Sequence, residues 1–134
     1  MTDRPFNRRA GQHILAIGTK GGLVKPSSGY AFLRMQKDAA AIVNSLLTHG
    51  HPFDVPRSPW RYRLFDSIML QVMYRQGHLM DRIFTNLFRN NSIHHIFRFL
   101  DETASFPENL RLLASLPPTP FIKALIRLKL LRKV

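Results

Sequence analysis

The chain has 134 residues, 45% of them hydrophobic, and its 20 Lys and Arg against 8 Asp and Glu give a formal net charge of +12. This length suffices for one compact domain or for the tail of a larger one. The charge favours anionic partners: nucleic acid, an anionic membrane face or the phosphate groups of a cofactor. The absence of cysteine excludes disulfides, thiolate metal sites and a cysteine nucleophile, and is compatible with the cytoplasm. No apolar run approaches the roughly 18 residues of a spanning helix, and the first residues lack the apolar core of a signal peptide.

The first element in chain order is a predicted strand over residues 13–17, HILAI, which runs into the glycine turn GTKGG. A helix is expected to follow, with Ser27 or Ser28 as its N-cap and Gly50 as its end. A lone strand leaves its backbone edges unpaired. Either a second short strand lies in the first residues, or the sheet belongs to another polypeptide segment.

The rest of the chain is predicted to be helical, giving about six helices in all. After a proline-rich loop at 51–59, a helix starts with Ser58 as N-cap and Pro59 at its first position, and stops at Gly77. Further helices are expected over residues 78–89, over 93–100 with Ser92 as the cap, from Pro107 onward, and from Thr119 and Pro120 to Arg132.

The segment from Gly18 to Tyr30 combines four glycines and a proline just before a helix. A glycine turn followed by a helix start directs backbone N–H groups and the positive end of a helix dipole toward one point. Such a point attracts an anion or an electron-rich carbonyl. The alternative is an ordinary glycine turn with no ligand.

The same segment carries a family resemblance. The pattern G-x-x-x-P-[ST]-[ST]-G-Y occurs in the second flavin-contacting turn of lycopene cyclases, which belong to the hydroxylase-like flavoproteins. It is matched one by one by Gly22, Pro26, Ser27, Ser28, Gly29 and Tyr30. The later segments LFDSIMLQVMYRQG, MDRIFTNLFRN and IFRFLDETASFPENLRLLASLPPTPFIKALIR resemble the helical tail of bacterial lycopene cyclases.

The resemblance implies a mainly α chain that forms the C-terminal part of a flavoprotein α/β fold. Residues 1–50 would end the FAD-binding domain with a strand, a glycine turn and a helix, and residues 51–134 would form a C-terminal helical region. It also implies reduced FAD, which assists a proton-initiated ring closure of lycopene or another linear carotenoid to β-rings, an isomerase reaction without net hydride transfer.

The cofactor-binding residues implied by the resemblance lie in the glycine turn, and the N–H groups of its last two residues would approach the pyrimidine edge of the flavin. They are Gly18, Thr19, Gly22, Pro26, Ser28, Gly29 and Tyr30. Thr19 stands where the family usually has an Asp. No G-x-G-x-x-G with a downstream acidic residue occurs anywhere in this sequence, so the element that holds the pyrophosphate is missing, and the protonating acid is expected upstream. We therefore predict that the chain alone does not bind FAD tightly and needs an N-terminal FAD-binding polypeptide as its partner.

Histidines and carboxylates give no comparable prediction. His49 and His51 are two residues apart and His94 and His95 are adjacent, so neither pair has helical metal-ligand spacing. Asp101 and Glu102 lie at a predicted helix end. Salt bridges to the many arginines are the expected role of these acids, and catalysis by Asp101 or Glu102 rests on the resemblance alone.

The C-terminal helix is strongly basic, and no acid follows Glu108. Its cations are Lys123, Arg127, Lys129, Arg132 and Lys133. Cations near a helix C-terminus are favourable in any protein, but a basic amphipathic helix can also lie on an anionic membrane, so peripheral membrane association is expected. The alternative function is a small basic helical protein that binds a membrane surface or nucleic acid without catalysis.

Overall fold

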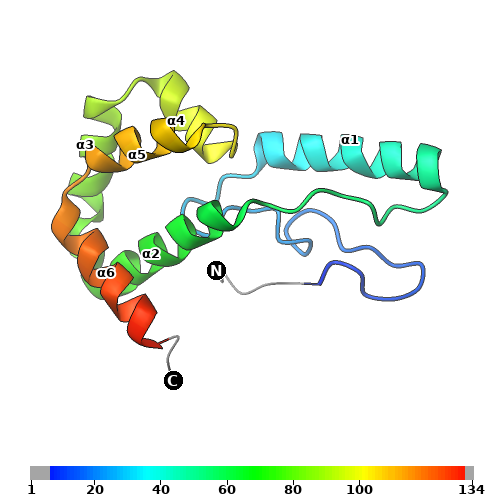
Figure 1. The fold of residues 1–134 in the computed structure, drawn as a ribbon, viewed down its shortest axis with the longest axis horizontal. Helices are drawn as coiled ribbons and strands as arrows, with labels where there is room; N and C mark the ends of the chain where they lie inside the picture. The colour runs from blue at the N-terminus through cyan, green and yellow to red at the C-terminus, as the bar shows by residue number, and fades with distance from the viewer. Residues whose placement is uncertain (1–6, 132–134) are drawn as a thin grey trace. The chain divides into compact units, whose positions relative to one another are not determined.

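The structure is a computed structural model that describes residues 7–131. It is mainly helical, which confirms the mainly α part of the predicted fold class (Figure 1). The chain divides into two compact units, residues 1–58 (unit 1) and residues 59–134 (unit 2). The helices are α1 (Phe32–His49), α2 (Trp60–Gln76), the 3-10 helix η1 (Gly77–Leu79), α3 (Met80–Asn90), α4 (Ile93–Leu100), α5 (Phe106–Ala114) and α6 (Pro118–Leu131).

The strand predicted over residues 13–17 does not form, so that prediction is wrong. Among the described residues, β pairing is limited to one isolated antiparallel bridge between Arg9 and Leu15. The segment instead folds back on itself, with the Ala10 N–H donating to the Ile14 carbonyl at 3.0 Å. A strand needs a continuous ladder of hydrogen bonds from a neighbour, and the described part of unit 1 supplies a single bridge.

Arg8 fastens this folded-back segment to α1. Its two terminal nitrogens donate to the two carboxylate oxygens of Asp38 at 2.6 and 2.7 Å. Its Nε donates to the Ala16 carbonyl at 3.1 Å. The planar guanidinium suits this two-point contact, and the Arg8 and Asp38 side chains are only 16% and 7% exposed. One side chain thus holds the loop closed and fixes it to the middle of the helix.

The start of α1 differs from the prediction, whereas its end agrees. The N-cap is Ala31, which makes no side-chain capping bond, so the prediction of Ser27 or Ser28 as the cap is wrong. The Ser28 hydroxyl instead accepts from the Tyr30 N–H, within the turn that precedes the helix. Gly50 ends the helix as predicted, with a left-handed φ of 69° and its N–H bonded to the Leu46 carbonyl.

Unit 1 buries polar rather than apolar side chains. Its buried charged and polar residues are Lys25, Asp38 and Ser45. All nine buried hydrophobic residues of the described chain lie in unit 2. Large hydrophobic side chains of unit 1 are exposed instead, namely Ile14, Ile17, Phe32, Val43, Leu46 and Leu47. The described residues of unit 1 therefore form an apolar surface and no apolar core.

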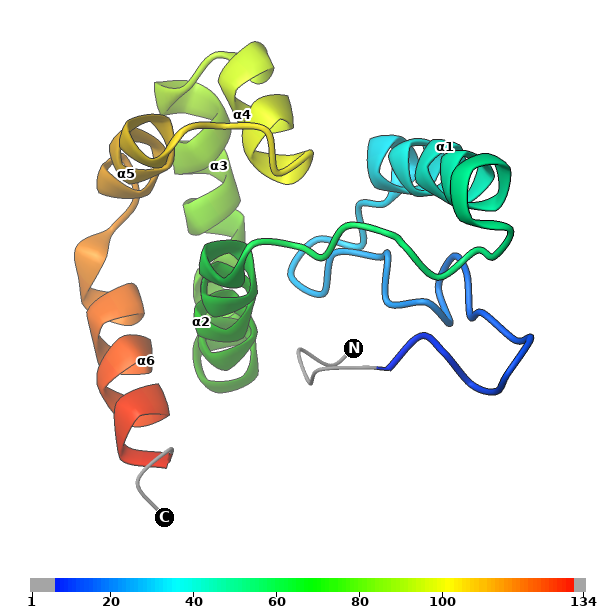
Figure 2. The same ribbon diagram turned by 45° about the vertical axis from the view of Figure 1, so that its right-hand side comes forward.

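Unit 2 is built around one apolar core to which α2 through α6 all contribute. The buried cluster comprises Val72, Ile83, Leu87, Ile96, Leu112, Leu116 and Ala124. Helix α6 packs against α2, while α3, α4 and α5 follow one another at one end of this pair (Figure 2). Burial of these side chains is the main stabilising contribution to this unit.

Among the helix starts of unit 2, those of α4 and α5 have a side-chain cap, whereas those of α2 and α3 have none. The predicted Ser92 cap of α4 is confirmed, since its side chain accepts from the His95 N–H. The prediction of Ser58 as the cap of α2 is wrong: the helix begins one residue later than predicted, at Trp60, with Pro59 as its N-cap and no side-chain capping bond. It ends at Gln76, immediately before the predicted stop at Gly77. Helix α6 starts at Pro118, slightly earlier than predicted.

A capping box starts α5. The Ser105 hydroxyl accepts from the Glu108 N–H, and the Glu108 carboxylate accepts from the Ser105 N–H at 2.7 Å. The backbone bond from Ser105 lowers the pKa of Glu108 most, followed by the Ser105 hydroxyl and the charge of Arg98, whose Nη2 lies 3.1 Å from the carboxylate. The folded structure therefore favours the charged form of the Glu108 carboxylate.

Replacing Asp38 tests the role of the buried ion pair. Asp38→Ala leaves the Arg8 guanidinium without its partner, and removing one member of a buried pair costs about 3–5 kcal/mol. We expect hydrogen exchange of the α1 amides to accelerate accordingly. Asp54→Asn is the control, because the His49–Asp54 pair is 3.8 Å apart and its side chains are 49% and 72% exposed. An exposed pair contributes about 0–1 kcal/mol. Equal effects of the two substitutions would contradict the assignment.

Acid titration tests the capping box. Because the pKa of Glu108 is lower in the folded state than in the unfolded chain, its stabilising effect is complete above the unfolded value. It is lost as the pH falls through the lowered folded value. Urea midpoints across this acid range should fall less steeply for Glu108→Gln than for the wild type. In Ser105→Ala, which removes one hydrogen bond of the capping box, the stabilising effect of Glu108 should be lost at a higher pH than in the wild type. Identical profiles for all three proteins would show that the box does not couple stability to pH.

Candidate functional site

The glycine turn before α1 is the candidate site, and its first half depends on left-handed backbone. Gly18 and Gly22 have φ values of 58° and 73°, a region that residues with a side chain rarely adopt. The Gly18 carbonyl accepts from the N–H groups of Gly21 and Leu23, and the Thr19 carbonyl accepts from the Gly22 N–H. The Thr19 side chain is exposed. Residues 18–23 thus form a tight turn.

Gly21 is required for a different reason. It is buried, and an added Cβ would lie 2.6 Å from the Ala16 carbonyl oxygen and 3.0 Å from the Ile17 Cα. Both atoms belong to the backbone, so neither can move aside as a flexible side chain would. The turn therefore closes only because position 21 has no side chain.

The second half of the turn closes on itself. The Lys25 carbonyl accepts from the N–H groups of Ser28 and Gly29, at 3.3 and 2.8 Å, and the Lys25 N–H donates to the Tyr30 carbonyl at 2.8 Å. The Tyr30 N–H donates to the Ser28 hydroxyl at 3.3 Å. The N–H groups of Gly29 and Tyr30, which the resemblance implies near a flavin, thus donate within the turn. Cofactor contact by Gly29 and Tyr30 stays a prediction. In this conformation the contact would involve atoms of these residues other than their backbone N–H groups.

The N-terminus of α1 lies immediately after this turn and supplies the positive electrostatics. No side chain caps the helix, and its first turn contains no acidic residue. The first N–H groups of a helix have no intrahelical partner, and the macrodipole places partial positive charge there. This arrangement fits the electron-rich edge of a reduced flavin or another anion. It provides a single wall of a site.

A buried polar network in unit 2 was not predicted from the sequence. The Tyr62 hydroxyl donates to the Ala104 carbonyl at 2.9 Å and accepts from the Asn109 side-chain amide at 3.3 Å. The Tyr62 and Asn109 side chains are 0% and 1% exposed. These bonds tie the start of α2 to the segment between α4 and α5. In the sequence, the sign of this region is the spacing of Ser105 and Glu108, which are three residues apart, as in a capping box.

Asp101 and Glu102 end α4. The Glu102 N–H donates to the Phe99 carbonyl at 3.2 Å, and the Thr103 N–H donates to the Arg98 carbonyl at 3.0 Å. This is a Schellman arrangement, in which Glu102 takes the left-handed position with a φ of 59°. A left-handed residue with a side chain costs about 1–2 kcal/mol. Ion pairs of carboxylates with arginines join Arg8 to Asp38 and Arg98 to Glu108.

The histidine pairs lie in two separate places. The rings of His49 and His51 stack at a centroid distance of 5.7 Å, and those of His94 and His95 lie 6.4 Å apart on exposed parts of α4. Within residues 7–131, no three His, Asp or Glu side chains gather where they could hold a metal ion. In the same range, no helix is long and apolar enough to cross a membrane.

Comparison with known families identifies the chain. A sequence model of the family described as lycopene cyclase protein matches residues 1–126, which is nearly the whole chain. The chain therefore belongs to the lycopene cyclase family, as its resemblance predicted. At the level of the family, this places it with the cyclisation of carotenoids. No curated protein and no solved structure gives a significant match.

A methyl group added in the turn tests its closure. Gly21→Ala forces the new Cβ against backbone, and overpacking of this kind costs about 1–3 kcal/mol. We expect faster hydrogen exchange of the amides in residues 18–30. The control is Gly11→Ala, whose Cβ would meet only the Ile14 side chain at 3.5 Å, an ordinary contact. If Gly21→Ala exchanges like the control, the close approach to Ala16 does not constrain the turn.

Proposed function

We propose that the chain is the C-terminal part of a flavin-dependent lycopene cyclase, which forms β-rings at the ends of lycopene. Membership of the family supports the cyclisation of a carotenoid. The observation that carries the flavin part is the uncapped N-terminus of α1, placed directly after a glycine turn with left-handed backbone. Together these two elements offer a positively polarised surface to an electron-rich ring edge.

The proposed cofactor contacts are those of the turn. Gly18, Thr19 and Gly22 would line one side of the flavin, and Pro26, Ser28, Gly29 and Tyr30 would lead into the helix start. Reduced FAD would supply negative charge that stabilises the cation formed when a proton adds to the end of the polyene. The chain's own contribution would be to orient the flavin edge with the positive end of the α1 dipole and to stabilise the negative charge on that edge.

The apolar surface of unit 1 supports a partner that supplies the rest of the flavin site. Unit 1 has no fully buried large hydrophobic side chain among its described residues, while Ile14 and Ile17 are 61% exposed and Leu47 is 81% exposed. Apolar surface of this kind is stabilised when it is covered. A nucleotide-binding polypeptide with a sheet would cover it and also pair with the backbone around the Arg9–Leu15 bridge. On the basis of this apolar surface, we propose that residues 1–50 form the end of an FAD-binding domain.

The alternative function is a small basic helical binding protein without catalysis. The net charge of +12 is the observation that favours it. In this alternative the glycine turn has no ligand, and its substitution would affect only stability. The two proposals are therefore distinguished by flavin retention and by carotenoid product.

Co-purification tests the flavin part of the proposal. The chain alone is expected to retain no FAD, because it holds one wall of the site and no pyrophosphate-binding element. Co-expression with the polypeptide encoded upstream of it, if that polypeptide carries G-x-G-x-x-G after a strand, should give a complex with flavin absorbance. A complex that forms without flavin would contradict the proposal, as would an upstream region with no such sequence.

Product analysis in lycopene-producing cells tests the role of the turn. In the co-expressed complex, Gly29→Val should abolish β-ring formation, because it places a β-branched side chain at a φ of 74° beside the proposed flavin. Gly50→Val is the matched control. It imposes a similar strain at a φ of 69°, but at the opposite end of α1. Unchanged product from Gly29→Val, or equal loss from both variants, would overturn the flavin-turn assignment.

A further inference from the structure

Helix α6 carries two apolar rows, and the structure uses only one of them in the core. Ala124 is 2% exposed, and Phe121, Leu125 and Leu128 are half-buried on the side that packs toward α2. Because this row is occupied by the core, it is not available to insert into a membrane.

The second row faces outward. Ile122 and Ile126 are one helical turn apart and each is 54% exposed. At 100° per residue they lie on the side of α6 opposite Ala124. Two branched apolar side chains on the outer face are unfavourable in water unless something covers them.

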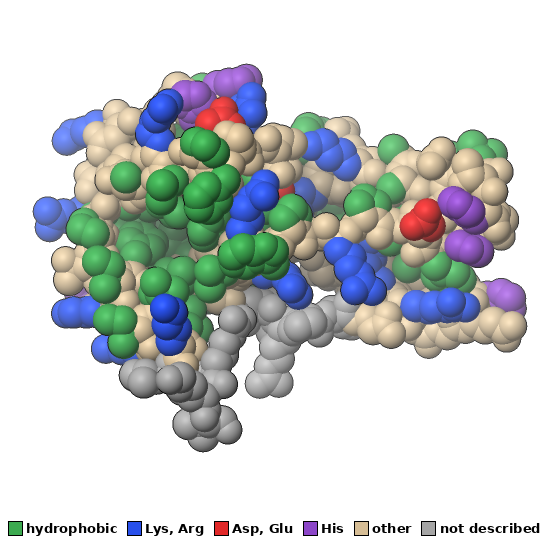
Figure 3. All heavy atoms as spheres, viewed as in Figure 1, with side chains coloured by type: hydrophobic (Ala, Val, Ile, Leu, Met, Phe, Trp, Pro, Cys, Tyr) green, Lys and Arg blue, Asp and Glu red, His purple; other side chains and the backbone are tan. Residues whose placement is uncertain are grey.

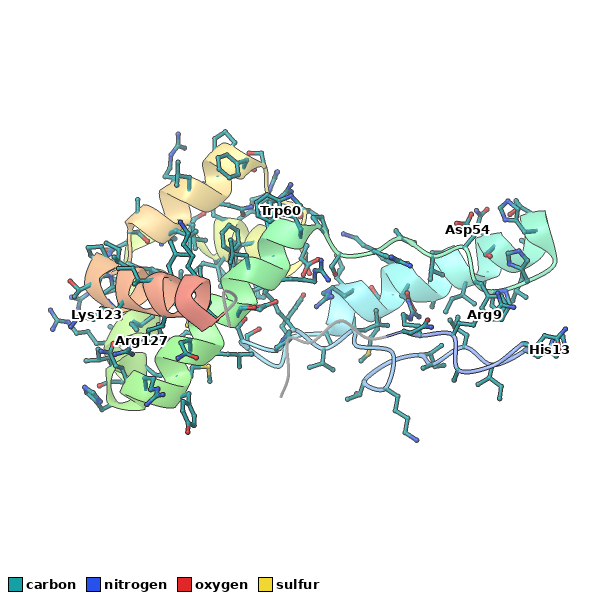
Figure 4. All side chains as sticks on the ribbon, turned by 60° about the horizontal axis from the view of Figure 1, so that its bottom comes forward. Arg9, His13, Asp54, Trp60, Lys123 and Arg127 are labelled. Carbon is teal, nitrogen blue, oxygen red and sulfur yellow. The ribbon has the colours of Figure 1, made fainter. Side chains whose placement is uncertain are left out.

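Cations border this outer row on both sides. Lys123 and Arg127 are exposed and extend from the same side of α6 (Figure 4). Lys129 is exposed and falls, by helical geometry, on the other side of the isoleucines. No Asp or Glu follows Glu108 in the sequence, so no acidic side chain of α6 offsets these charges.

The surroundings of α6 continue the apolar character. On one face of unit 2, apolar side chains gather over α2, α5 and α6, with Lys and Arg side chains among them (Figure 3). Trp60, at the start of α2, is 69% exposed. Tryptophan is enriched where a protein meets the headgroup layer of a bilayer. Isolated exposed apolar residues are ordinary, but an apolar row bordered by cations is typical of helices that lie in a membrane interface.

We infer that the outer face of α6 binds an anionic lipid surface. Ile122 and Ile126 insert at the boundary between headgroups and acyl chains, and Lys123, Arg127 and Lys129 contact the headgroup phosphates. The charge of the face selects a negatively charged partner. Ile122 and Ile126 favour lipid over nucleic acid as this partner. A phosphodiester backbone is polar, so binding it would not stabilise the exposed apolar side chains. This inference stands on the surface of unit 2 and is independent of the proposed function.

Vesicle binding by the full chain tests the inference. Co-sedimentation is measured with phosphatidylcholine vesicles with and without phosphatidylserine, and we expect binding only to the anionic vesicles. The double variant Ile122→Ser with Ile126→Ser should lose most of this binding. Its matched control is Ile93→Ser with Phe97→Ser on α4, which has the same spacing and exposures of 55% and 46%. Far-UV circular dichroism confirms that each variant keeps its helices.

Charge variants distinguish binding through the outer face of α6 from general attraction between a basic protein and an anionic membrane. Lys123→Gln with Arg127→Gln should weaken binding about 30-fold, as expected for removing two cations at an anionic surface. Arg63→Gln with Arg89→Gln removes the same charge from exposed positions on α2 and α3 and should have a much smaller effect. Equal losses from both charge pairs, full binding by the isoleucine variant, or binding to duplex DNA in preference to the vesicles would each overturn the inference.

Discussion

The two-point contact between Arg8 and Asp38 is the constraint on which unit 1 depends. It joins a segment without regular structure to the middle of an 18-residue helix, and both side chains are largely withdrawn from water. The same guanidinium binds the Ala16 carbonyl, so the ion pair also fixes the chain just before Gly18. The glycine turn is thus held between the Arg8 contact on one side and α1 on the other. In unit 1 a buried ion pair joins the elements, whereas apolar packing joins them in unit 2. Removing either partner is costly because the other charge would stay buried without its partner.

The two units therefore differ in how they are stabilised, and this difference bears on function. Unit 2 is stabilised by a shared apolar core, two capped helix starts and a buried Tyr62–Asn109 network. Unit 1 has polar anchors and an uncovered apolar surface. That contrast, together with membership of the lycopene cyclase family, is why we propose that unit 1 belongs to a larger flavin-binding assembly. The basic outer face of α6 belongs to unit 2 and needs no such partner to be complete.

Local rules in the sequence were enough for most of the helical organisation. Ser92 and Gly50 act as predicted because a cap depends on backbone and side-chain groups within a few residues. The strand over residues 13–17 was predicted from an apolar run, and it failed because a strand depends on a partner that is distant in sequence or on another chain. Ser28 was predicted as a cap and instead closes the turn with the Tyr30 N–H, a choice between two local partners that composition does not resolve.

The sequence by itself determined the mainly helical class, the resemblance to the family carried by Gly22, Pro26, Ser27, Ser28, Gly29 and Tyr30, and the positive charge of the C-terminal helix. These properties follow from periodicity, capping residues and short patterns, all of which act over a few positions. Only the tertiary structure decided that Arg8 pairs with Asp38, that the Gly29 and Tyr30 N–H groups donate within the turn, and that Ile122 and Ile126 rather than Phe121 and Leu125 face outward. Each of these depends on which groups the fold brings together and which it leaves in water, and that is set by packing between elements far apart in the sequence.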